Sequence, residues 1–176
     1  MLTIFYTFIG LFIPCLLLGT LLYLLVVLCL WFTKKRQYFT FKRCLIEFTF
    51  CCYLIALANL TGLFNIRLSY FFSFHATPNL IPILNTLREV FEYGPYVLKQ
   101  FFLNVALYVP FGILVSLLLR KPTLLQLLLL AGCTSLLIET LQYFGRRFAD
   151  IDDLLSNIIG ALLGYLLIKL IKKAID

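Results

Sequence analysis

The otherwise apolar last third of the chain carries a row of polar side chains. They are Glu139, Gln142, Arg147, Asp150, Asp152, Asp153 and Asn157. A carboxylate, amide or guanidinium group placed where lipid is the solvent is energetically costly unless it is paired or used, so such residues indicate a functional site. Carboxylates and amides hydrogen-bond sugar and peptide groups or hold a hard cation, and arginine holds phosphate.

The spacing of the acidic residues predicts one polar helix face. The residues that fall within an arc of about 80°, at about 100° per residue, are Asp150, Asp153, Asn157, Gly160 and Gly164. Asp152 points elsewhere. The two glycines, four residues apart, let a neighbouring helix approach this face closely and seat the polar residues against it.

The preceding apolar segment ends with a second polar pair. Glu139 and Gln142, at i and i+3, share one helix face and are placed to look across at the acidic face. We expect Gly145 to end this helix as its C′ residue. One arginine of the Arg146–Arg147 pair can then form a bidentate fork with a carboxylate of either helix, or hold a phosphate.

An earlier apolar segment adds an amide and a proline. We place Asn104 at the same membrane depth as the acidic residues. Pro110 and Gly112 interrupt the segment, and the proline leaves a backbone carbonyl one turn earlier without its usual donor. We expect nearby polar side chains or water to satisfy this carbonyl; the alternative is a kink that only shapes packing.

Membrane helices must position these residues. The 176-residue chain is 62% hydrophobic and 13% charged, and its mean hydropathy of +1.01 exceeds what a soluble core of this length could hide. Residues 2–33 carry no charge and are too long for a signal-peptide core, so we expect a retained first span. The apolar segments are about 2–33, 44–64, 101–119, 123–144 and 154–171. The sequence therefore predicts an all-α, polytopic membrane helical bundle with about five transmembrane helices, in a single domain over residues 1–176.

The longest break, about 65–100, contains an amphipathic segment. Its apolar residues recur at helical spacing and are Ile83, Leu84, Leu87, Val90 and Phe91. Pro82 suits the first turn of this helix, where its missing N–H would be unpaired anyway. We expect the helix to lie flat at the outer membrane face, with re-entry into the bundle as the alternative.

The distribution of lysine and arginine predicts the orientation. If the first helix runs inward, the cytoplasmic set is Lys34, Lys35, Arg36, Lys42, Arg43, Arg120, Lys121, Lys169, Lys172 and Lys173. The smaller outer set is Arg67, Arg88, Lys99, Arg146 and Arg147. We therefore expect the N-terminus outside, the C-terminus in the cytoplasm, and the polar residues within about two helical turns of the outer surface.

Other charged and sulfur-bearing residues have plainer interpretations. The net charge of +7 is spread over helix ends, so nucleic acid is not an expected partner. The six cysteines lie in or beside apolar segments without metal-type spacing against the single histidine, His75, and we interpret them as small core hydrophobes. Glu47 follows Arg43 by four residues, which predicts an ordinary ion pair on one helix.

The order and spacing of the polar motifs resemble the VanZ-like family of bacterial membrane proteins. The motifs are Asn79-Leu80-Ile81-Pro82, Asn104 with Pro110-Phe111-Gly112, Glu139-Thr140-Leu141-Gln142, Arg147-Phe148-Ala149-Asp150 leading to Asp153, and Asn157-Ile158-Ile159-Gly160. The resemblance covers about residues 79–164. The expected ligand-binding residues are Asn104, Glu139, Gln142, Arg147, Asp150, Asp153 and Asn157. The expected structural residues are Asn79, Pro82, Pro110, Gly112, Gly160 and Gly164.

The resemblance implies a part in lowering susceptibility to glycopeptide antibiotics, especially teicoplanin. We expect a multi-pass protein of the bacterial cell membrane that contacts lipids and binds an envelope lipid, a lipid-linked cell-wall precursor or the antibiotic, without a cofactor or catalysis. One alternative is a membrane enzyme in which Glu139, Asp150 and Asp153 hold Mg²⁺ and act on a lipid-linked substrate, although no nucleophile stands beside a base. The other is a structural protein in which these residues only fix the bundle.

Overall fold

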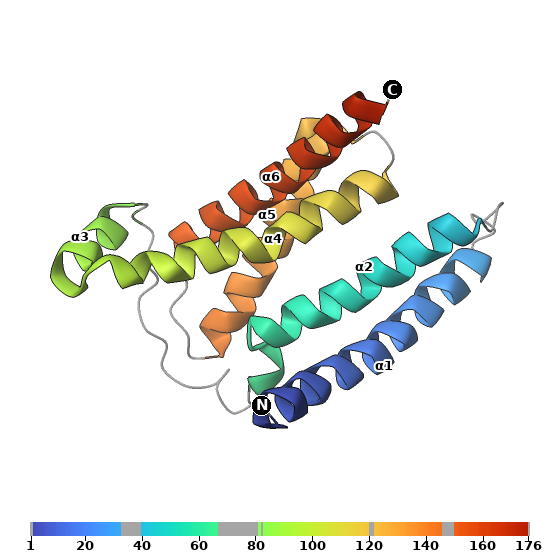
Figure 1. Cartoon of the computed structure of the whole chain (residues 1–176), viewed down its shortest axis with the longest axis horizontal. Helices are drawn as coiled ribbons and strands as arrows, with labels where there is room; N and C mark the ends of the chain where they lie inside the picture. The colour runs from blue at the N-terminus through green and yellow to red at the C-terminus, as the bar shows by residue number, and fades with distance from the viewer. Residues whose placement is uncertain are drawn as a thin grey trace. The chain divides into compact units, whose positions relative to one another are not determined.

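Long apolar helices make up nearly all of the described chain. The computed structural model describes residues 2–32, 40–66, 81, 83–119, 122–145 and 150–175. The helices are α1 (Leu2–Phe32), α2 (Phe41–Leu60), η1 (Leu63–Asn65), α3 (Leu84–Tyr93), η3 (Pro95–Val97), α4 (Leu98–Leu118), α5 (Leu124–Phe144) and α6 (Ile151–Ile175), as Figure 1 shows. No strand occurs in these ranges, so the prediction of an all-α fold is confirmed.

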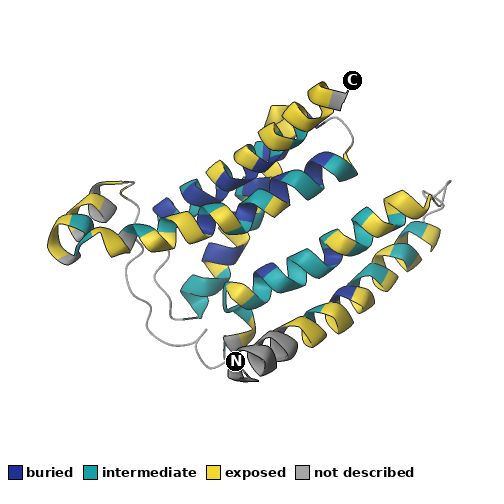
Figure 2. Ribbon diagram, viewed as in Figure 1, coloured by how far each residue is buried: buried dark blue, intermediate teal, exposed yellow. Residues whose placement is uncertain are grey.

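Five of the helices are long and apolar enough to cross a membrane. The candidate spans are Phe12–Phe32, Phe41–Leu60, Leu98–Leu118, Leu124–Phe144 and Ile151–Ala174. A helix of about 20 residues covers the hydrocarbon thickness of a bilayer. Many large apolar side chains on these helices are exposed (Figure 2), the pattern expected when lipid is the solvent. The predicted five-span membrane fold is confirmed.

The chain packs as two compact units, Met1–Thr61 and Gly62–Asp176. In the first, α1 and α2 form a helical hairpin in which Gly19 brings the helices together, because a Cβ at Gly19 would lie 2.6 Å from Cys52 Sγ. Arg43 Nε lies 2.9 Å from Glu47 Oε1, which confirms the predicted ion pair. The single-domain assignment stays a prediction.

In the second unit α4 packs mainly on α6, and α5 packs on α6 as well. Figure 1 shows α4 and α6 side by side with α5 behind them. Asn104 meets Asp153 and, two turns further on, Gly112 meets Ala161, so α4 and α6 run in the same direction. Because α5 connects them and runs the opposite way, its C-terminal end lies beside the starts of its two neighbours.

Helix ends in this unit are fixed by local chemistry. At the start of α5, the Gln126 N–H donates to Thr123 Oγ1 at 3.2 Å and the Thr123 N–H donates to Gln126 Oε1 at 3.0 Å, a reciprocal capping box. α5 ends at Phe144 with Gly145 as its cap, but Gly145 has a φ of −81° and is not left-handed. A glycine is needed there for space, since a Cβ would lie 2.7 Å from Ile66 Cγ1.

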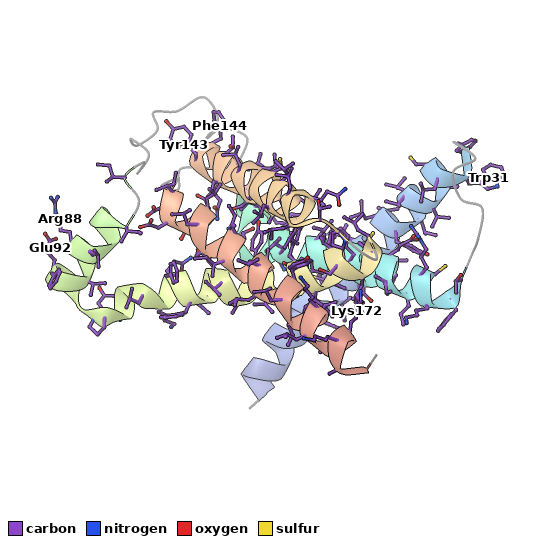
Figure 3. All side chains as sticks on the ribbon, turned by 90° about the horizontal axis from the view of Figure 1, so that it is seen from above. Trp31, Arg88, Glu92, Tyr143, Phe144 and Lys172 are labelled. Atoms are coloured by element: carbon purple, nitrogen blue, oxygen red, sulfur yellow. The ribbon has the colours of Figure 1, made fainter. Side chains whose placement is uncertain are left out.

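The predicted amphipathic helix is α3, and its start differs from the prediction. The helix begins at Leu84, and Ile83 precedes it with a φ of +64° and ψ of −39°. Leu87 and Phe91 are exposed. Figure 3 shows Arg88 and Glu92 next to each other on α3, directed away from α4 and α6.

Candidate functional site

The polar side chains of the second unit gather at one end of α4, α5 and α6. Asn104 of α4 donates from Nδ2 to Asp153 Oδ1 of α6 at 2.6 Å. Its own Oδ1 accepts a bond from Gln100 Nε2 at 3.3 Å. Asn104 is only 8% exposed. A buried amide that meets a carboxylate in this way ties α4 to α6, because either group alone would lose its hydration without compensation.

Glu139 holds the end of α5 against the start of α6. Its Oε2 atom accepts a hydrogen bond from the backbone N–H of Asp150 at 3.3 Å, and its side chain is buried. Asp150 in turn caps α6, since its Oδ1 accepts from the N–H of Asp152 at 2.9 Å. A side-chain cap satisfies a backbone donor that the first turn would leave unpaired. This cap explains why α6 begins at Ile151 rather than near Leu154, where the apolar run starts.

A second polar layer lies one turn deeper. Asn157 Nδ2 of α6 donates to Ser135 Oγ of α5 at 2.9 Å, and the Tyr108 phenol of α4 lies beside Ser135 and the Glu139 carboxylate. We call Asn104, Glu139 and Asp153 the first polar layer, and Tyr108, Ser135 and Asn157 the second polar layer. On each helix the two members are four residues apart, about 6 Å along the axis. The layers therefore stack.

Apolar and small residues close the unit below the second polar layer. The buried side chains there are those of Phe111, Val115, Leu127, Ala131 and Ala161. Figure 2 shows this buried region along the middle of α4 and α6. The two polar layers are thus confined to one end of the three helices; Figure 3 marks that end of α5 with Tyr143 and Phe144, and the far end of α6 with Lys172.

Three glycines bring the backbones of α4 and α6 into contact. A Cβ on Gly112 would lie 1.9 Å from the carbonyl oxygen of Ala161. A Cβ on Gly160 would lie 2.2 Å from the Val105 oxygen, and one on Gly164 would lie 2.1 Å from the Val109 oxygen. No larger residue fits at these positions unless a backbone moves, which is the close approach that small residues allow between membrane helices.

The remaining predicted site residues are less central or lie outside the described part of the chain. Gln142 is half-buried on α5, one turn nearer its end than Glu139. Pro110 is exposed within a continuous α4, whereas Gly112 is buried against α6. The predictions for Arg146, Arg147, Asn79 and Pro82 fall outside the described residues.

Asp152 points away from the polar layers, and the structure shows where. Its Oδ1 accepts a hydrogen bond from the backbone N–H of Ile83 at 2.8 Å, and the side chain is 7% exposed. Ile83 makes this bond from a positive φ that β-branched residues rarely adopt. The start of α3 is therefore anchored to the first turn of α6.

Sequence reasoning missed Tyr108, Ser135 and Gln100. Tyrosine and serine are common in apolar helices, so neither draws attention by its type. A usable signal was present, because Tyr108 follows Asn104 by four residues and Ser135 precedes Glu139 by four. Residues at this spacing share a helix face with the residues that were predicted.

The described site presents amide, carboxylate and hydroxyl groups from three helices. Within the described ranges, no group of three or more His, Cys, Asp or Glu side chains is placed to share a metal ion. Groups of the kinds present exchange hydrogen bonds with sugar hydroxyls and peptide amides. The binding of a ligand by these residues remains a prediction.

Comparisons with known proteins identify the family. Neither the curated proteins nor the solved structures contain a match to this chain. The family model described as VanZ/LLP1 matches residues 20–172, which takes in both polar layers and the three glycines. The match covers well over half of the chain and agrees with the resemblance seen in its motifs, so the chain belongs to the VanZ/LLP1 family.

Proposed function

We propose that this VanZ-family membrane protein binds a polar head group at the polar end of α4, α5 and α6 and thereby reduces susceptibility to glycopeptide antibiotics such as teicoplanin. The head group belongs to an envelope lipid, a lipid-linked cell-wall precursor or the antibiotic itself. The protein lies in the bacterial cell membrane with its N-terminus outside and its C-terminus in the cytoplasm, so the polar layers face outward.

The burial of polar groups from three helices in two stacked layers carries this proposal. Placing such groups between membrane helices is costly. Packing of α4 on α6 does not depend on them alone, because Gly112, Gly160 and Gly164 bring the two backbones into contact beside the second polar layer and deeper in the unit. A binding site explains why polar side chains occupy positions between α4, α5 and α6 at which apolar side chains would also pack.

The chemistry of the layers favours a ligand rich in hydroxyl and amide groups. Asn104, Asp153 and Glu139 supply amide and carboxylate groups at the polar end of the three helices. These groups accept bonds from sugar hydroxyls or peptide N–H groups. We assign Arg147 the role of gripping a phosphate or carboxylate, for which the guanidinium fork is suited.

The alternative of a structural polar cluster is favoured by one observation. Polar groups of neighbouring helices already bond one another, as Asn104 does with Asp153 and Asn157 with Ser135. In that case a substitution should remove folded protein together with any activity. A binding site instead allows a folded protein that no longer binds.

Substitution of Glu139 by glutamine distinguishes a binding site from a structural polar cluster. We expect purified Glu139→Gln protein in lipid nanodiscs to stay folded and to bind teicoplanin, or a lipid-linked cell-wall precursor, at least about tenfold more weakly, because a bond to a charged acceptor is worth about 1.5–3 kcal/mol. Isothermal titration calorimetry measures the Kd. The matched control is Thr140→Val on the same helix, an exposed residue whose hydroxyl bonds Leu136 O of its own helix, and it should bind as the unmodified protein does.

Undiminished binding in Glu139→Gln would reject the proposal. So would a Glu139→Gln protein that no longer folds, if the unmodified protein binds neither probe.

A further inference from the structure

The hydroxyl of Tyr108 stands out within the second polar layer. Tyr108 is 1% exposed. Its Oη atom is buried beside the Ser135 hydroxyl, but it reaches hydrogen-bond geometry with no residue in the described part of the chain. Most buried polar side-chain atoms in proteins have a partner, and a buried hydroxyl without one costs about 1–3 kcal/mol. Such a group requires an explanation.

Ser135 lies next to Tyr108 and adds a second hydroxyl group. Its Oγ accepts a bond from Asn157 Nδ2, and its hydroxyl lies beside that of Tyr108. The second polar layer therefore contains two neighbouring hydroxyl groups that can donate, Tyr108 from α4 and Ser135 from α5. Both can donate to a single acceptor oxygen.

The charge around these donors restricts which acceptor they can hold. The Glu139 carboxylate, one turn above Ser135 on α5, lies within electrostatic reach of the Tyr108 hydroxyl. The negative charge of this carboxylate repels an anionic oxygen bound by Tyr108 and Ser135, and a medium of low dielectric constant strengthens the repulsion. It accepts a hydrogen bond from a neutral hydroxyl or amide without such a penalty.

We infer that the second polar layer is the inner subsite of the proposed binding site, and that Tyr108 and Ser135 hold a neutral oxygen, a sugar hydroxyl or an amide carbonyl, rather than a phosphate. The inference rests on the proposed function and adds to it the chemical class of the group that enters furthest. Phosphate groups of the ligand stay beyond the first polar layer, because the Glu139 and Asp153 carboxylates of that layer repel them as well.

The test compares two alkyl probes of equal chain length, an alkyl glucoside and an alkyl phosphate, each below its critical micelle concentration. The unmodified protein in nanodiscs should bind the glucoside at least tenfold more tightly than the phosphate. Tyr108→Phe should lose about tenfold in glucoside affinity, which corresponds to about 1.4 kcal/mol for one hydrogen bond, and should leave phosphate affinity unchanged.

Tyr108→Phe also has a stability readout that a packing role would not share. The substitution removes only an oxygen that lacks a partner among the described residues, so the Tm without ligand should stay equal or rise. With tyrosine labelled by ¹³C at Cζ, the resonance that Tyr108→Phe eliminates should shift when the glucoside is added and not when the phosphate is added.

Three results would overturn the inference. One is an equal loss of affinity for both probes in Tyr108→Phe, which would indicate that Tyr108 acts through packing. Another is a clear fall in its Tm, which indicates a structural bond to Ser135. The third is a Tyr108 resonance that does not shift when the glucoside is added.

The inference and the proposed function can fail separately. Teicoplanin binding that depends on Glu139 but not on Tyr108 would remove the inference alone. Glucoside binding through Tyr108 in a protein that binds neither teicoplanin nor the precursor would remove the proposed function alone.

Discussion

Individual side chains were predictable where their type contradicted their surroundings. Asn104, Glu139, Asp153 and Asn157 are conspicuous in apolar sequence, and the structure brings them to one end of three helices. Tyr108 was not conspicuous, because a phenol fits an apolar helix as readily as a polar site. Its importance comes from the missing hydrogen bond, which only the packed helices show.

The Asn104–Asp153 bond gives a prediction at this scale. Asn104→Leu keeps the branched shape of the side chain but removes the donor to Asp153 Oδ1. We expect the free energy of unfolding to fall by about 1 kcal/mol, the usual worth of a side-chain bond between membrane helices. Denaturant titration in mixed micelles measures it. Thr140→Val, on the exposed face of α5, should change stability by less than about 0.5 kcal/mol, and an equal effect of the two would contradict the prediction.

Helices were predictable in number and type, and less so at their ends. Apolar runs locate the five spans, yet α4 and α6 each begin about one turn before the predicted start. The Asp150 cap extends α6 past its apolar residues, and α4 begins at Leu98, directly after η3. The pairing of α4 with α6 and the register of that pair were not predictable. Gly160 and Gly164 indicate a close neighbour, but nothing in the sequence states which helix it is.

Two glycines in similar helices should respond oppositely to alanine. Gly112→Ala would place a Cβ 1.9 Å from a backbone oxygen of α6, so α4 and α6 must separate. We expect its thermal midpoint to fall, by an overpacking cost of about 1–3 kcal/mol. At Gly132 of α5 a Cβ would meet only Ile158 Cδ1 at 3.9 Å, so Gly132→Ala should hold or raise the midpoint through its better helix propensity. A Gly112→Ala protein as stable as Gly132→Ala would contradict the packing described here.

At the scale of the whole molecule, the sequence predicts class and orientation from sums over many residues. The high apolar content predicts a membrane protein, and the structure has five helices able to span. The division into Met1–Thr61 and Gly62–Asp176 was not predictable, because both units are built from apolar helices and only contacts separate them. The family match begins at residue 20 and so includes helices of both units.

Orientation is testable by cysteine labelling. With the six native cysteines replaced, a cysteine introduced at His75 should react with a membrane-impermeant maleimide in intact cells. One introduced at Lys35 should react only after the membrane is opened, because the excess of lysine and arginine retains that loop in the cytoplasm. Gel-shift detection of the label reads both. The reverse pattern would contradict the proposed orientation.

The direction of α6 has an electrostatic consequence. Its first turn carries Asp152 and Asp153, and its last turn carries Lys172 and Lys173. A helix macrodipole places about half a positive charge at the start and half a negative charge at the end, so each pair sits at the pole that attracts it. The backbone itself thus places partial positive charge at the polar end of the unit. The electrostatic field at the polar end therefore depends on the direction in which α6 crosses the bilayer, as well as on the side chains near a bound ligand.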